Sequence, residues 1–180
     1  MKKVLIILAS LVGLWLLTAI FMPSERVVTR EIDIYAPADS VFEQFNTLKY
    51  WKKWSYWDQA DSTMKSTYNG PESGVGATHS WESEQMGNGT LTIIESNRPT
   101  SIKYELAFEG MEPSIGSISL VGRGNDLIVT MELQMNLPFV FRPLGLISDF
   151  MIGPDFEASL EGLKNSIEIN KTDKPNPKIK

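Results

Sequence analysis

The sequence predicts an α+β domain in which a curved antiparallel sheet of about six to seven strands wraps around a long C-terminal helix. One N-terminal transmembrane helix precedes this domain. Three observations support the prediction. Residues 4–22 carry no charge, segments that alternate between apolar and polar residues follow one another between residues 30 and 135, and apolar residues near the C-terminus recur with helical spacing.

The first element is an uncharged run of 19 residues, Val4–Met22, preceded by Lys2 and Lys3. As a helix it would be about 28 Å long, which matches the hydrocarbon core of a bilayer. Lysines beside a span stay on the cytoplasmic side, so we expect the following chain on the extracytoplasmic side of the inner membrane. A cleaved signal peptide and a buried helix of a soluble protein are the alternatives. The run is longer than the usual apolar core of a signal peptide.

We therefore divide the chain into a cytoplasmic N-terminus at residues 1–3, a single-pass signal anchor at residues 4–22, a domain at residues 23–170 and a flexible polar tail at residues 171–180. The formal net charge of −5 offers no basic surface to nucleic acid. The chain has no cysteine, so the domain has neither disulfides nor thiol chemistry.

The domain opens with a strand and a short helix. Residues 30–35 alternate between apolar and charged side chains, which is typical of a half-buried strand. Pro37 suits a first helical turn, and one apolar stripe follows at helical spacing, formed by Val41, Phe42, Phe45 and Leu48. An aromatic loop at residues 50–57 and a polar loop at residues 58–66 lead to the main sheet.

Five further segments show the alternation of strands, at residues 77–84, 90–95, 101–109, 115–121 and 127–135. Gly87-Asn88-Gly89 and residues 122–126 are predicted hairpin turns. An apolar, partly helical segment at residues 139–152 follows, and Gly153-Pro154 is expected to separate it from the closing helix. That helix carries the stripe Phe156, Leu160, Leu163 and Ile167. Laid across the concave face of the sheet, it would leave a cavity wherever side chains do not fill the space.

The element order and five local motifs resemble the helix-grip superfamily of START-like and polyketide cyclase-like proteins, the SRPBCC group, in a bacterial branch. Tyr56 stands where the tryptophan motif of that branch usually has proline, and Ser159 where the closing helix usually has glycine. The resemblance implies the helix-grip fold but no single activity, because this fold hosts lipid carriers and cyclases alike. The motifs are Ala36–Phe42, Trp51–Trp57, Tyr68–Gly76 with Trp81, Gly87–Gly89 and Phe156–Lys164.

Aromatic residues and one methionine are the candidate ligand-binding residues, because they lie in the aromatic loop or on the predicted inward faces of strands. Tyr104 would contribute one of few polar groups to the cavity and could orient the polar end of a ligand. Ordinary core packing is the alternative for the whole set, and a register slip of one residue would turn any strand outward. The set is Trp54, Trp57, Trp81, Tyr104, Phe108 and Met131.

We expect a membrane-anchored binding module for a hydrophobic small molecule or lipid in the bacterial envelope, and the sequence contains no motif for a nucleophile, nucleotide or metal ion. We therefore assign no catalytic residue, metal site or cofactor. Two alternatives stay open. One is a cyclase-type or isomerase-type enzyme in which His79 or Tyr104 acts as acid or base. The other is an envelope domain that binds a protein partner through an exposed apolar patch. The sequence does not predict the oligomeric state.

Overall fold

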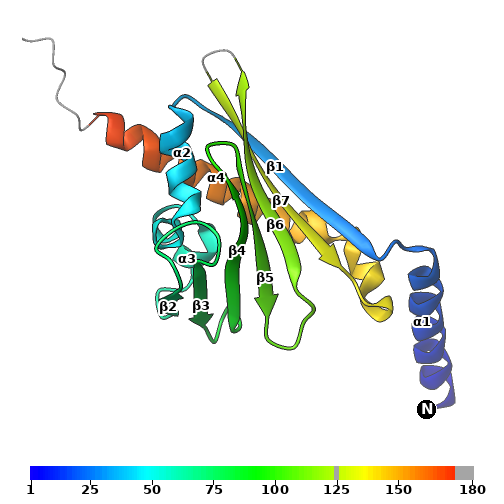
Figure 1. Ribbon diagram of the computed structural model, residues 1–180. Helices are drawn as coiled ribbons and strands as arrows, with labels where there is room; N and C mark the ends of the chain where they lie inside the picture. Colours follow the sequence, from blue (N-terminus) through cyan, green and yellow to red (C-terminus); the bar gives the residue numbers. More distant parts are fainter. Residues whose placement is uncertain (124–125, 173–180) are drawn as a thin grey trace, which may run out of the picture.

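One antiparallel sheet of seven strands dominates the structure, a computed structural model that describes residues 1–123 and 126–172. Figure 1 shows the sheet curving in front of the long C-terminal helix α4, Ser148–Thr172. The order of strands across the sheet is β1-β7-β6-β5-β4-β3-β2, so only β1 is displaced from chain order. This arrangement confirms the predicted α+β fold with a sheet around a long helix. The strands are β1 Glu25–Ile34, β2 Lys65–Asn69, β3 Thr78–Glu82, β4 Gly89–Asn97, β5 Ser101–Phe108, β6 Ser114–Arg123 and β7 Asp126–Asn136.

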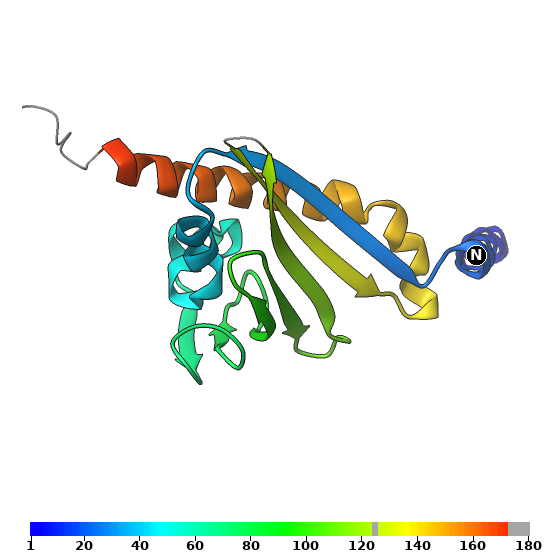
Figure 2. The same ribbon diagram turned by 45° about the horizontal axis from the view of Figure 1, so that its top comes forward.

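Three short helical segments connect β1 to β2 and cover one end of the sheet (Figure 2). They are α2 Ala38–Asn46, the 3-10 helix η1 Leu48–Lys53 and α3 Tyr56–Ala60. The predicted stripe of α2 is buried, because Val41, Phe42 and Phe45 each expose at most 1 % of their surface. The stripe of α4 is buried against it, so both helices contribute to one core with the sheet.

Helix α1, Lys2–Phe21, projects away from the domain (Figure 1). Within the described residues it is the one helix long and apolar enough to cross a membrane. Only 6 % of its most apolar stretch of 18 residues is buried inside the structure, whereas the core helix of a soluble protein is mostly buried. A second 3-10 helix, η2 Phe139–Leu146, lies beside α1 and leads into α4.

The structure corrects the sequence-based expectations for two loops. The aromatic loop is helical, as η1 and α3. The polar loop at residues 58–66 contains the start of β2, whose residues show little alternation and which forms by pairing with β3 at the sheet edge. The predicted turn at residues 122–126 includes residues 124–125, which lie outside the described residues, as does the tail beyond Thr172.

Helix α4 also begins earlier than predicted and runs through Gly153 and Pro154 without a break. Proline removes one backbone hydrogen bond from a helix, but Arg30 on β1 holds both sides of this position. Its guanidinium donates to Asp149 at 2.8 and 3.0 Å and to Glu157 at 2.6 Å. Gly153 lies against the same guanidinium, so a side chain at this position would displace the arginine from its place. Charge-assisted hydrogen bonds from one arginine on β1 thus reach α4 on both sides of Pro154.

Tyr104 on β5 lies in the centre of the core and exposes none of its surface. Its ring covers Gly116, its partner on β6, and no side chain would fit there beside it. Trp51 packs against the same ring with centroids 5.4 Å apart. The buried hydroxyl of Tyr104 has no hydrogen-bond partner among the described residues, and burial raises its pKa above the ordinary value for tyrosine.

Replacing Tyr104 by phenylalanine should therefore stabilise the protein. An unpaired buried polar group lowers stability by about 1–3 kcal/mol, so we expect Tyr104→Phe to raise the free energy of unfolding by about 1 kcal/mol. Denaturant unfolding followed by tryptophan fluorescence measures the change. Tyr50→Phe, at an exposed position, is the matched control and should leave stability unchanged. A loss of stability in Tyr104→Phe would show that the hydroxyl has a partner.

Candidate ligand-binding cavity

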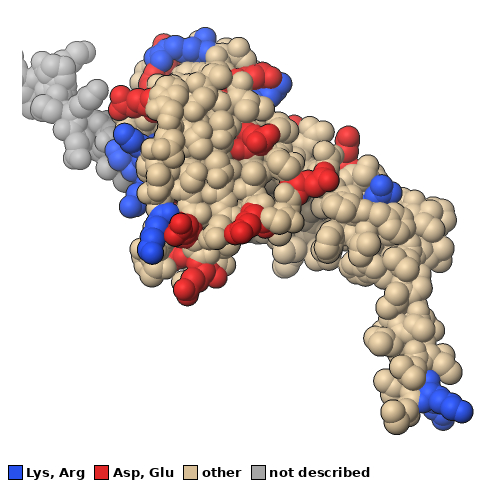
Figure 3. Space-filling model, turned by 60° about the horizontal axis from the view of Figure 1, so that its bottom comes forward, with Lys and Arg blue, Asp and Glu red and all other residues tan. Residues whose placement is uncertain are grey.

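A cavity of about 330 Å³ lies between the concave face of the sheet and the first half of α4. The inward faces of β3, β4, β5 and β7 form one wall, and α3 with the first turns of α4 forms the other. Figure 3 turns this end of the sheet, with the β3–β4 and β5–β6 connections, toward the viewer. The cavity is thus placed where a helix-grip fold leaves space between its two layers.

Most of the cavity wall is carbon and sulfur. Five of the eight methionines of the chain line it, and unbranched methionine side chains adapt to ligands of different shape. Four aromatic rings, one of them Trp51 of η1, and three leucines add rigid apolar surface. The methionines are Met64, Met86, Met111, Met135 and Met151, and the other apolar side chains include Trp57, Trp81, Phe108, Leu91, Leu106 and Leu133.

Four rings form a row across the sheet beside the cavity. Tyr68 on β2 stacks on His79 at 4.6 Å, and Trp81 follows at 5.4 Å and Phe108 at 5.7 Å between ring centroids. Gly89 on β4 is the register partner of both Trp81 and Phe108. Because the glycine has no side chain, the two rings from the strands on either side meet over its backbone. Glycine at position 89 therefore allows the Trp81 and Phe108 rings to contact each other in the cavity wall.

The polar groups of the wall gather near α3. The Nε2 atom of His79 lies 3.0 Å from the Ser66 hydroxyl. Burial lowers the pKa of His79, although the negative charge of Asp58 raises it again in part. Burial likewise raises the pKa of Asp58, against the opposing effects of His79, a hydrogen bond from Ser55 and Lys52. The cavity therefore contains a neutral histidine beside a carboxylate that is held in an unfavourable, partly buried environment.

Helix α3 is fixed to α4 by two hydrogen bonds. The Trp57 indole donates to the Asp155 carboxylate at 2.9 Å, which holds its ring in the cavity wall. The backbone N–H of Tyr56 donates to the Ser159 hydroxyl at 3.0 Å, and that hydroxyl donates to the Asp155 carbonyl. Proline at 56 would have no N–H and glycine at 159 no hydroxyl. Tyr56 and Ser159, the two residues that differ from the motifs that the sequence resembles, thus form a hydrogen bond with each other.

The six predicted site residues fall into two groups. Trp57, Trp81 and Phe108 lie on the cavity wall, whereas the other three are buried outside it. The Trp54 indole donates instead to the Gln44 carbonyl at 3.1 Å, and Met131 is 1 % exposed. Tyr104 belongs to the core described above, so its hydroxyl is not a polar group of the cavity wall. A binding role for any of the six stays a prediction.

Alternation along the strands predicted correctly which face of each strand points inward. It did not predict how far the cavity extends along that face. On β5, Leu106 and Phe108 line the cavity and Tyr104 does not. On β7, Leu133 and Met135 line it and Met131 does not. The cavity takes only one end of each strand, and Trp51, which packs on the Tyr104 ring, forms part of its boundary with the core. The methionines in the connecting turns and Asp58, the partner of His79, were missed, since they lie outside the alternating segments.

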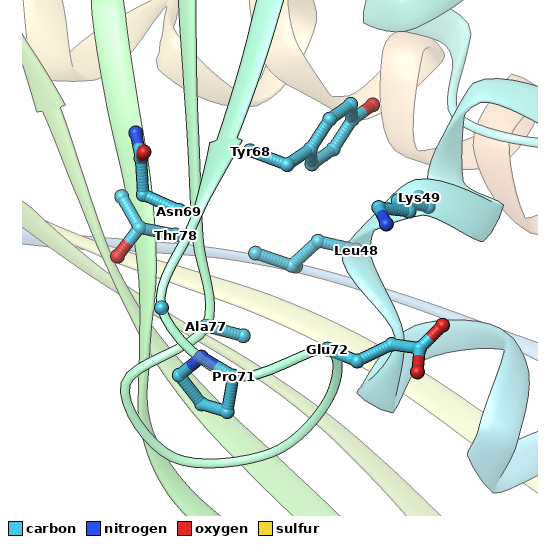
Figure 4. Close-up of a pocket in the computed structure, with 9 residues that line it drawn as sticks. Leu48, Lys49, Tyr68, Asn69, Pro71, Glu72, Ala77 and Thr78 are labelled. Atoms are coloured by element: carbon cyan, nitrogen blue, oxygen red, sulfur yellow. The ribbon is translucent and has the colours of Figure 1, made fainter.

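A second, smaller hollow of about 60 Å³ lies at the edge of the sheet (Figure 4). Figure 4 shows Tyr68 of β2 and Leu48 and Lys49 of η1 around it, with the loop of Pro71 and Glu72 opposite. Its volume is well below the roughly 300–1,000 Å³ of typical ligand sites. The larger cavity is therefore the candidate site.

No family model and no curated protein sequence matches the chain. Solved structures do match it. A protein of unknown function, SA2116 from Staphylococcus aureus, has a TM-score of 0.63 at 9 % identity and covers 83 % of this chain and 98 % of its own. A norcoclaurine synthase from Thalictrum flavum, in complex with a transition-state analogue, has a TM-score of 0.62 at 15 % identity and covers 82 % of this chain and 96 % of its own.

The Aha1 dimer from Colwellia psychrerythraea has a TM-score of 0.57 at 19 % identity and covers 81 % of this chain and 98 % of its own. These likenesses show a shared fold and support the predicted resemblance at that level. They assign no activity, because a synthase and a protein of unknown function share this fold.

The Asp58–His79 pair makes a testable prediction about proton binding. By NMR titration, the pKa of His79 should lie below the ordinary value of about 6.5, and Asp58→Asn should lower it further by removing the negative charge. A histidine with a lowered pKa binds its proton less readily in the folded state. Stability should therefore fall as the pH drops below about 6.5, more steeply in Asp58→Asn.

Glu105→Gln, on the exposed outer face of β5, is the matched control and should leave the titration of His79 unchanged. A pKa of His79 that does not respond to Asp58→Asn would show that the two groups do not interact.

Proposed function

We propose that the chain is a membrane-anchored member of the helix-grip superfamily that binds a hydrophobic small molecule or lipid on the extracytoplasmic side of the membrane. The observation that carries the proposal is the cavity, whose volume and largely apolar wall fit such a ligand. The polar groups near α3 would receive the polar end of the ligand, while methionines and aromatic rings surround its apolar part. Helix α1 would hold the domain at the source of such molecules.

The anchor is proposed from the length and composition of α1 and from its exposure. Lys2 and Lys3 before the span favour a cytoplasmic N-terminus. Protease added to spheroplasts should then digest the domain. A protected domain would reverse the topology, and a shortened protein free of the membrane would show a cleaved signal peptide.

A tryptophan placed inside the cavity should abolish ligand binding. Ser114, at the start of β6, lines the cavity, so the indole of Ser114→Trp would occupy the ligand's space. Ser117→Trp, on the opposite face of the same strand, is the matched control. The full chain is incubated with fatty acids, isoprenols and phospholipids and then released from detergent. Native mass spectrometry measures the fraction of the protein that carries a bound molecule.

We expect the wild-type protein and Ser117→Trp to retain a hydrophobic molecule, and Ser114→Trp to retain at most about one tenth as much, which corresponds to about 1.4 kcal/mol. Equal retention by all three proteins would place the ligand elsewhere. A wild-type protein that binds none of the panel would contradict the proposal.

A second candidate is an enzyme that acts on the bound molecule, and the Asp58–His79 pair is the observation that favours it. A neutral histidine beside a carboxylate can accept and return a proton within the cavity. The test compares the molecules extracted from cells that express wild-type protein or His79→Gln. A carrier yields the same compound from both, whereas an enzyme yields a chemically different compound from the variant.

A further inference from the structure

Eight large apolar side chains are exposed in the segment that joins β7 to the body of α4. We call residues 139–151 the apolar ledge. Phe150 exposes 82 % of its surface, Leu146 63 % and Phe141 53 %, far beyond the scattered exposure of a soluble surface. The eight are Phe139, Val140, Phe141, Leu144, Leu146, Ile147, Phe150 and Met151. Arg142 and Asp149 are the only charged residues of the ledge, and Asp149 is paired with Arg30.

The ledge packs against α1. The Trp15 indole of α1 donates a hydrogen bond to the Val140 carbonyl at 2.8 Å, and Ala19 is fully buried in the structure. Figure 1 places η2 beside the end of α1 from which β1 starts. Figure 3 shows few charged atoms over this region, which continues into the uncharged body of α1. The ledge and the helix therefore present one continuous apolar surface.

From this geometry we propose that the apolar ledge is a second membrane contact, inserted in the outer interfacial layer of the same bilayer that α1 crosses. The proposal rests on the anchoring role proposed for α1. Trp15 lies six residues before Phe21, which corresponds to about 9 Å along the helix axis. A segment bonded to Trp15 is thus held at the depth of about 5–10 Å that interfacial helices reach.

The polar groups of this region suit the same position. The hydrogen bond from Trp15 satisfies the Val140 carbonyl, which would otherwise be unpaired in an apolar layer. Arg26 and Arg142 have no carboxylate partner among the described residues, and the Arg142 guanidinium lies 5.5 Å from the centre of the Phe139 ring. Long arginine side chains at this level can extend to lipid phosphates while their stems stay in the apolar layer.

The ledge would also bring the cavity to the lipid surface. Met151 belongs to both the ledge and the cavity wall, and Ile152 and Met135 continue that wall. A hydrophobic ligand could then pass between bilayer and cavity along apolar side chains. A protein partner would also explain the exposed side chains, but it would not explain why they continue the apolar surface of a helix long enough to cross a membrane.

Fluorescence labelling tests the proposal directly, because the chain has no cysteine and each introduced cysteine is unique. The variants Phe141→Cys, Phe150→Cys, Leu14→Cys and Val75→Cys are labelled with the polarity-sensitive dye NBD. The full chain is then reconstituted in vesicles of phosphatidylethanolamine and phosphatidylglycerol. Leu14 reports the anchor, and Val75, exposed in the loop before β3, is the matched control outside the membrane.

We expect blue-shifted emission from the labels at 14, 141 and 150, but not from the label at 75. Spin-labelled lipid should quench 141 and 150 more strongly when its doxyl group is near the head group than when it is near the chain end. A blue shift at 14 alone would overturn the ledge and leave the anchor intact. No shift at 14 would overturn the anchor and the ledge together. Shifts at 141 and 150 that occur only in native membranes would show a protein partner and overturn the lipid contact.

Discussion

Helix α4 can lie across this sheet only because its backbone comes very close to the tryptophan segment. A side chain at Gly162 would begin 2.5 Å from the Trp54 carbonyl oxygen, so glycine is required at this contact. Three residues earlier, Ser159 accepts the backbone N–H of Tyr56. The two contacts fix the position of η1 and α3 on the helix. Trp51 and Trp54 are thereby directed into the space between helix and sheet.

The cavity is a consequence of this contact. Beyond it, toward the C-terminus of α4, Leu163 and Ile167 lie in the core. On the other side of it, the first turns of α4 are held by the paired carboxylates around Arg30 on β1, and the interior side chains do not fill the space. One half of the domain thus supplies the hydrophobic stability, and the other half keeps room for a ligand. The arrangement separates a rigid core from an adaptable methionine-lined wall.

The same first turns of α4 connect the cavity to the proposed membrane surface. Met151 is exposed on the ledge and also lines the cavity, so movement of a ligand would not require unfolding of the core. The domain would then act at the membrane surface. The anchor would then hold the cavity at the bilayer from which its ligand comes.

Periodicity in the sequence determined much of the fold, because burial on one face imposes a repeat of two in strands and 3.6 in helices. It was sufficient for the inward faces of β3, β5 and β7 and for the buried stripes of α2 and α4, while the length and composition of an uncharged run were sufficient for helix α1. It was not sufficient for β2, which forms through pairing with β3 at an edge, or for the start of α4, which continues through Gly153 and Pro154. Nor could it assign Trp54, Tyr104 and Met131 to the core, because alternation does not show how far a cavity extends along a strand. The sequence by itself thus determined the layers and their faces, whereas only the tertiary structure decided which half of the interior stays open, since that depends on contacts between residues far apart in the chain.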